Sequence, residues 1–120
     1  MFFLAPSPIA GTGVFSWFAL EPGNLIFSYD AVDDTVLIAE MPAEEPLKTL
    51  VNRFGVETKE GIWIPSDFNR MGVWWFINHS NEPNIEYVGN DMLAARGIAA
   101  GEELTIDYRT LDADFNNLDF

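Results

Sequence analysis

The sequence contains no cysteine and a single histidine, His79, among its 120 residues. The first absence excludes disulfide bonds, thiolate zinc sites and cysteine nucleophiles. The second leaves no histidine cluster, so we expect no metal site. No apolar run is long enough to span a bilayer, and we expect no membrane partner. The apolar start of the chain lacks a basic segment and is interrupted by Pro6 and Pro8, so it does not predict a signal peptide.

Basic side chains are also scarce. Lys and Arg total 6 whereas Asp and Glu total 19, which gives a formal net charge of −13. This charge disfavours direct binding to nucleic acid, because phosphates need Lys and Arg to displace their counterions. It favours a basic partner through electrostatic steering, although an excess of acid also simply keeps a small protein soluble.

The length fits one domain, and a hydrophobic fraction of 48% is typical of a globular chain. Short runs of β-forming residues predict a mostly β fold. The predicted strands are residues 2–4, 25–29, 35–39, 92–96 and 104–108, with 61–65 as a short strand or turn. Leu47, Leu50, Val51 and Phe54 recur at helical spacing, so residues 47–54 are the best helix candidate. We expect one or two helices, all between residues 42 and 76.

Three motifs are ambiguous when each is taken alone. Gly11-Thr12-Gly13 lacks the third glycine and the following helix of a dinucleotide site, so it is first of all a hairpin turn. Residues 78–84 are rich in Asn and Ser around Pro83, which suits either a rigid loop or a set of backbone amides that bind a polar ligand. Tyr108, at the end of a predicted strand, could be an ordinary half-buried tyrosine.

Taken in order, these motifs resemble a known family. The matching pieces are Gly11-x-Gly13-Val14-Phe15, Pro22-Gly23-x-Leu25-Ile26-x-x-Tyr29, Asn78-His79-Ser80-x-x-Pro83-Asn84, Ala95-Arg96-Gly97-Ile98 and Gly101-Glu102-Glu103-Leu104-Thr105-Ile106-Asp107-Tyr108. Their order and spacing over residues 9–109 resemble the SET domain family. The resemblance implies a single SET domain over residues 1–120, with 110–120 as a short C-terminal tail.

The resemblance also implies a fold and a cofactor. The family's β-clip fold consists of small curved sheets, with a C-terminal pseudoknot that would bring Asn78 and His79 beside Tyr108. The expected cofactor is S-adenosylmethionine. By similarity, its binding residues would be Gly11, Thr12, Gly13, Val14, Phe15, Asn78 and His79. Phe115 in the tail is a candidate to cover the adenine, or else to pack on the core.

The implied activity is methyl transfer to a lysine amine on a basic protein, possible substrates including a histone tail. Tyr108 matches the family's catalytic tyrosine, and Tyr29 and Tyr108 would line the lysine channel. Ile106 occupies the position that influences how many methyl groups are added, and Ile, which has no hydroxyl, favours more than one. The alternative is an inactive SET-like module that binds basic partners through its acidic surface.

Two further expectations follow from the resemblance and the composition. Small stand-alone members can depend on a homodimer, which would fit the apolar excess of this chain. We expect a soluble protein in the cytoplasm, with the nucleus or host chromatin as alternatives.

Overall fold

A computed structural model describes residues 1–28 and 35–110 of the chain. They form two compact units, which lie within Met1–Val32 plus Val73–Phe120 and within Asp33–Gly72. We call these the two-segment unit and the central unit. Strands dominate both units, and α1 (Leu47–Phe54) is the only α-helix of the described residues. The predicted mostly β composition is therefore confirmed. No helix in the described ranges is both long and apolar enough to cross a membrane.

The first sheet of the two-segment unit brings together strands from early and late in the sequence. Its order is β1-β2-β10-β7, from β1 (Phe2–Pro6), β2 (Thr12–Ser16), β10 (Glu103–Ile106) and β7 (Asn78–His79). β10 pairs antiparallel with β2 and parallel with β7, so it lies between them. The strand predicted at the start of the chain is confirmed and extends to Pro6.

One prediction about this sheet was left open and another is wrong. Residues 78–84 suited either a rigid loop or a set of backbone amides that bind a ligand, and the first two of them form a short strand because Asn78 and His79 pair with Thr105 and Ile106 of β10. The strand predicted to reach Tyr108 ends at Ile106. The following residues turn into the 3-10 helix η3 (Tyr108–Thr110), in which the carbonyl oxygen of Asp107 accepts a hydrogen bond from the Thr110 amide at 2.9 Å.

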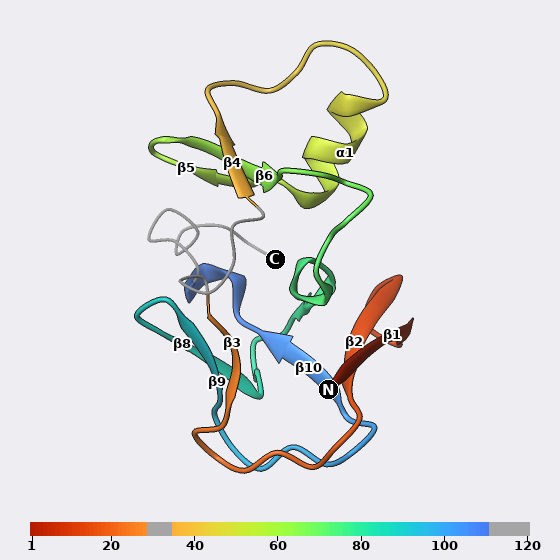
Figure 1. The fold of residues 1–120 in the computed structure, drawn as a ribbon, viewed down its shortest axis with the longest axis vertical. Coiled ribbons are helices and arrows are strands. Elements are labelled where there is room, and N and C mark those ends of the chain that lie inside the picture. Colours follow the sequence, from red (N-terminus) through yellow and green to blue (C-terminus); the bar gives the residue numbers. More distant parts are fainter. Residues whose placement is uncertain (29–34, 111–120) are drawn as a thin grey trace. The chain divides into compact units, whose positions relative to one another are not determined.

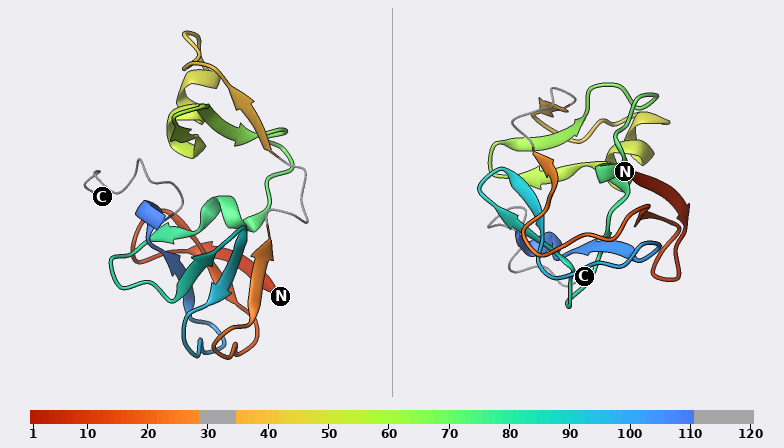
Figure 2. Two further views of the ribbon diagram at one scale, coloured as in Figure 1. Left: turned by 90° about the vertical axis from the view of Figure 1, so that its left-hand side faces the viewer. Right: turned by 60° about the horizontal axis from the view of Figure 1, so that its bottom comes forward.

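A second sheet has the order β3-β9-β8, from β3 (Leu25–Ser28), β9 (Asp91–Ala94) and β8 (Ile85–Val88). β8 was not predicted. It pairs antiparallel with β9, and this pairing holds the chain that follows β7 in the second sheet. The loop after β2 and the loop before β10 run side by side at the bottom of Figure 1 and Figure 2 (left), where Leu20 and Ile98 form a β-bridge.

One apolar core holds these sheets together. Its buried members are Val14, Phe27, Ile77, Ile85, Met92, Ala94, Ile98, Leu104 and Ile106. Leu104 lies opposite Val14 across the β10–β2 pair, and neither is accessible to solvent. Trp74 of η2 (Val73–Phe76) stacks on Phe27, with the ring centroids 4.2 Å apart. Because each such buried side chain contributes about 1.5–3 kcal/mol, this core fixes β10 in position.

The central unit has its own small core. Its sheet order is β4-β6-β5, from β4 (Thr35–Ile38), β6 (Gly61–Pro65) and β5 (Val56–Thr58). α1 has the bounds that the apolar spacing predicted, and it buries Val51 in one cluster with Ile62 and Ile64. α1 and the 3-10 helix η2 lie in or at the end of the range 42–76 in which one or two helices were expected, whereas the short 3-10 helix η3 lies outside that range.

Candidate active site

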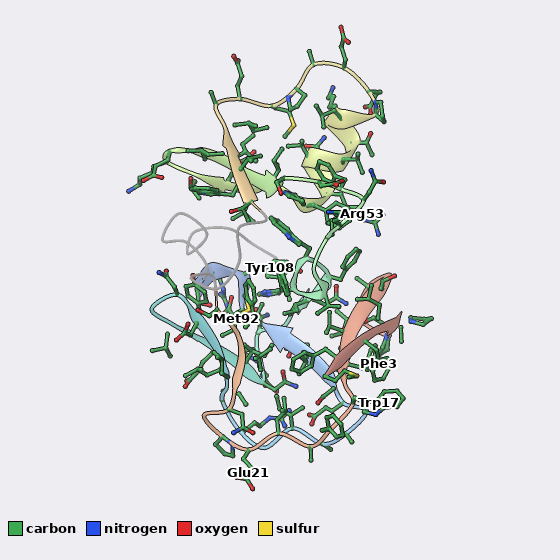
Figure 3. The ribbon with its side chains drawn as sticks, viewed as in Figure 1. Phe3, Trp17, Glu21, Arg53, Met92 and Tyr108 are labelled. Carbon is green, nitrogen blue, oxygen red and sulfur yellow. The ribbon has the colours of Figure 1, made fainter. Side chains whose placement is uncertain are left out.

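Tyr108 lies where β10 ends, as labelled in Figure 3, and its ring is half-buried against the core. Its hydroxyl donates a hydrogen bond to the carbonyl oxygen of Ile77 at 2.6 Å. Its backbone amide donates to Nδ1 of His79 at 3.1 Å, and the two rings lie 5.2 Å apart between centroids. Tyr108 and the Asn78-His79 segment, which are about 30 residues apart in the sequence, therefore lie side by side, as the resemblance implied.

The phenol of Tyr108 is held in its neutral form. Burial raises the pKa of Tyr108, the negative charge of Glu103 raises it further, and the backbone amide of His79 opposes these effects. A phenol that titrates above 10 is protonated at pH 7. Because its hydrogen is directed at the Ile77 carbonyl, the hydroxyl oxygen acts only as an acceptor toward any further partner.

His79 connects Tyr108 to the loop that follows β7. Since Nδ1 accepts the Tyr108 amide hydrogen, the neutral ring carries its proton on Nε2, which donates to Oδ1 of Asn81 at 2.9 Å. Arg109 donates to the same Asn81 oxygen at 3.1 Å. Its guanidinium also binds the Asp107 carboxylate at 2.7 and 2.8 Å, and these bonds lower the pKa of Asp107. The sequence analysis did not identify the role of Arg109.

Asn78 connects the same loop to the glycine turn. Its Nδ2 donates to Glu103 Oε2 at 2.8 Å, to the Ala10 carbonyl at 3.1 Å and to the Thr12 carbonyl at 3.3 Å. A fourth acceptor, Ser7 Oγ, lies at 3.1 Å. Since every neighbour of this nitrogen is an acceptor, the amide orientation is determined. Within the described residues no hydrogen bond uses Asn78 Oδ1, which can therefore accept from a ligand.

The five residues predicted to hold the cofactor through their backbone lie in different surroundings. Gly11 has a φ of 45°, a turn conformation that favours glycine, and Thr12 follows it beside Asn78. The side chain of Val14 is in the core, and that of Phe15 stacks on Phe3 on the other face of the hairpin, with ring centroids 5.7 Å apart. Figure 3 labels Phe3 beside Trp17 there. Gly13 faces the Glu103 carboxylate.

The remaining predicted residues are placed as follows. Ile106 is 1% exposed and belongs to the apolar core. Tyr29 and Phe115 lie outside the described residues, so their expected roles stay predictions.

Asn84, which the sequence placed in the 78–84 motif without an individual role, is a structural residue of the site. It is almost fully buried, and its amide nitrogen donates to the Glu103 carbonyl at 2.8 Å. Its Oδ1 accepts from the Thr105 amide, also at 2.8 Å. Segment 78–84 is therefore bound to β10 both through β7 and through Asn84. A polar residue after Pro83 was a signal for such a role, because asparagine readily bonds to backbone groups.

Comparison with known proteins identifies this arrangement. The SET domain family model matches residues 11–109, which is most of the chain. The chain belongs to the SET domain family. SET domain methyltransferases generally transfer a methyl group from S-adenosylmethionine to lysine. A comparison with curated proteins found no match.

Solved structures with the same fold include a candidate histone methyltransferase of Plasmodium falciparum. It is 24% identical, has a TM-score of 0.56, and the match covers 89% of this chain and 91% of that one. The Polycomb repressive complex 2 of Chaetomium thermophilum matches at 22% identity, with a TM-score of 0.59 and 90% of this chain covered. A humanized mutant of that complex bound to an inhibitor matches at 23% identity, with a TM-score of 0.60 and 92% of this chain covered.

This chain spans only 15% of the matched chain in each Polycomb structure. At these identities the likeness shows the fold alone. The predicted SET-type fold class is therefore confirmed.

Proposed function

We propose that this SET domain transfers a methyl group from S-adenosylmethionine to the ε-amine of a lysine on a basic protein. The observation that carries the proposal is the position of the Tyr108 hydroxyl, 2.6 Å from the Ile77 carbonyl and next to the Asn78-His79 segment. This position matches the role that the family resemblance assigns to the tyrosine.

The residues around the glycine turn fit the proposed cofactor. Asn78 Oδ1 is an acceptor suited to the ammonium group of S-adenosylmethionine, and the nearby Glu103 carboxylate suits a cation. The backbone of residues 11–15 and His79 would complete the site, with Phe115 as the proposed cover of the adenine. When bound, the cofactor supplies a methyl group on a positively charged sulfur, and this charge passes to the lysine nitrogen as the C–S bond breaks and the N–C bond forms.

Tyr108 would act by orientation and not as a base. Its O–H bond points to Ile77, so the oxygen lone pairs can accept C–H···O contacts from a methyl group, each contributing about 0.5–1 kcal/mol. The attacking amine must be neutral, although a free lysine is protonated at pH 7. Desolvation beside the half-buried ring would lower the amine pKa and release that proton to water before transfer. Holding the reacting atoms in line would account for much of the acceleration.

The charge of the chain supports a basic substrate. With 19 acidic against 6 basic side chains, the protein would attract a lysine-rich peptide and increase its rate of encounter. A histone tail has this chemistry, and one structure with the same fold is described as that of a candidate histone methyltransferase. We therefore propose a histone-like protein as the substrate class.

Two measurements test the proposal in sequence. Isothermal titration calorimetry with S-adenosylmethionine should show saturable binding at one site per chain. Transfer of labelled methyl from the cofactor to purified histones and to a cell lysate should then label lysine. Absence of cofactor binding would instead support the alternative, an inactive acidic module that binds basic proteins.

A further inference from the structure

Glu103 places a carboxylate directly against the glycine turn. Its two oxygens accept hydrogen bonds from Ser7 Oγ at 2.8 and 2.9 Å, and Oε2 also accepts from Asn78 Nδ2 at 2.8 Å. A Cβ atom on Gly13 would overlap Oε2 and lie 2.8 Å from Cδ of the same carboxylate. The space over Gly13 is therefore used by Glu103, and a side chain at position 13 would have to displace the carboxylate.

The charge of this carboxylate has no counter-cation among the residues that the structure describes. Its hydrogen-bond donors are a hydroxyl and an amide, both neutral. Across residues 1–28 and 35–110, no basic side chain lies within ion-pair distance of Glu103. Two nearby carboxylates do have a counter-cation, because Glu102 pairs with Arg96 at 2.7 Å and Asp107 pairs with Arg109. An uncompensated, half-buried negative charge thus touches the turn that is expected to bind the cofactor.

We propose that Glu103 is a specificity-determining residue that makes the site prefer the cationic sulfonium of S-adenosylmethionine to the neutral thioether of S-adenosylhomocysteine. The inference rests on the function proposed above. The two molecules share their adenosine and amino-acid parts and differ by one methyl group and its positive charge. A fixed negative charge attracts the first more than the second. Loss of that attraction after transfer would favour release of the product.

A purely structural role of Glu103 predicts a different result. If the carboxylate only braces the turn, removing it would weaken the binding of both molecules by the same factor. If its charge acts on the sulfonium, removing it would weaken one of them selectively. The ratio of the two dissociation constants therefore separates the roles.

The test measures both dissociation constants by calorimetry for the full chain and three variants. E103Q keeps the size and one acceptor oxygen but removes the charge, and we expect its preference for the sulfonium to fall about tenfold, the effect of one charge at a partly exposed site. S7A removes hydrogen bonds to the carboxylate but keeps its charge, so the ratio should stay at the wild-type value. E102Q removes the adjacent charge, which Arg96 already compensates. This variant should also leave the ratio of the two dissociation constants unchanged.

The outcomes are distinguishable. An equal change for both ligands in E103Q, or the same change of ratio in S7A, would overturn the inference while leaving the proposed function in place. Failure of the wild-type chain to bind either molecule would overturn both. Should E103Q fail to fold, the wild type gives a second measurement: added salt should weaken the binding of the sulfonium more than that of the thioether. Equal salt dependence would contradict the role of the charge.

Discussion

Replacing Tyr108 with Phe removes the hydroxyl and leaves the ring. The variant loses the 2.6 Å hydrogen bond to the Ile77 carbonyl, which contributes about 1 kcal/mol to the free energy of unfolding. In a domain of this size that loss lowers the melting temperature by about 4 °C. Even from a modest starting stability of about 5 kcal/mol, about 99.9% of the molecules stay folded at 25 °C. Unfolding therefore cannot explain a large loss of activity.

The expected loss of activity is much larger. Removing one preorganised polar group from a transition state typically costs about 100-fold or more in kcat. We expect Y108F to lose about 100-fold in kcat for transfer of labelled methyl to histones, while its dissociation constant for S-adenosylmethionine changes less than about threefold, since the hydroxyl would act mainly on the methyl group in transit.

The matched control is Y87F. Tyr87, on β8, is half-buried against the same core, and the substitution removes a phenol hydroxyl from a position that has no proposed role in the reaction. It should retain wild-type kcat. Near-wild-type transfer by Y108F, or an equal loss in Y87F, would refute the assignment of Tyr108 as the catalytic residue.

Four other predictions concern product, packing, pH and association. Replacing buried Ile106 with Tyr should overpack the core by about 1–3 kcal/mol and shift products toward fewer methyl groups by mass spectrometry, whereas I106F should cause only the first effect. An unchanged product distribution in I106Y would contradict the role of this position. Gly13→Ala should displace the carboxylate that faces it and lower stability by about 1–3 kcal/mol in urea unfolding, whereas Gly97→Ala, with its nearest atom 3.8 Å away, should have little effect. Equal effects would contradict the close approach. The lowered pKa of Asp107 means that its contribution to stability is present above the ordinary value of 3.8 and is lost as pH falls through the lowered one, so melting temperatures of wild type and D107N should converge below about pH 4. A constant difference down to pH 2 would show that the carboxylate is not involved. Trp17 is 59% exposed on a hairpin whose residues 1–20 carry no charged side chain, so we expect a homodimer by sedimentation velocity that W17S weakens. A wild-type monomer at high concentration would exclude it.

Local patterns in the sequence predicted individual elements well. The bounds of α1 follow from four apolar residues on one face, and Val51 is the one that becomes buried. β8 was missed because four residues with one charged side chain give a weak signal. The end of β10 was misplaced because it depends on Asp107, whose Oδ1 accepts a hydrogen bond from the Arg109 amide at 3.0 Å and starts the turn. A pattern of alternating side chains does not contain that bond.

The meeting of the Asn78-His79 segment with Tyr108 was predictable from the ordered set of motifs but not from any single one. The proximity of Tyr108 and His79 followed from the family resemblance, since neither residue was informative alone. The bonds between Ser7, Asn78 and Glu103 were not predictable, because hydrogen bonds between distant segments leave no local periodicity. Gly13 shows the same limit. The sequence indicated a turn at this glycine but did not identify the Glu103 carboxylate that lies against it.

The hydrogen bond from Ser7 to Glu103 joins residues that are 96 positions apart. A contact of this kind forms only after a very large loop has closed, so we expect the site to assemble late in folding and the chain to fold slowly for its size. The cost of closing a loop rises by only about 0.6 kcal/mol when its length doubles. Residues 33–72, which separate the two parts of the two-segment unit, could therefore lengthen or be exchanged at little cost to that unit, and the proposed site around Tyr108 would stay as it is.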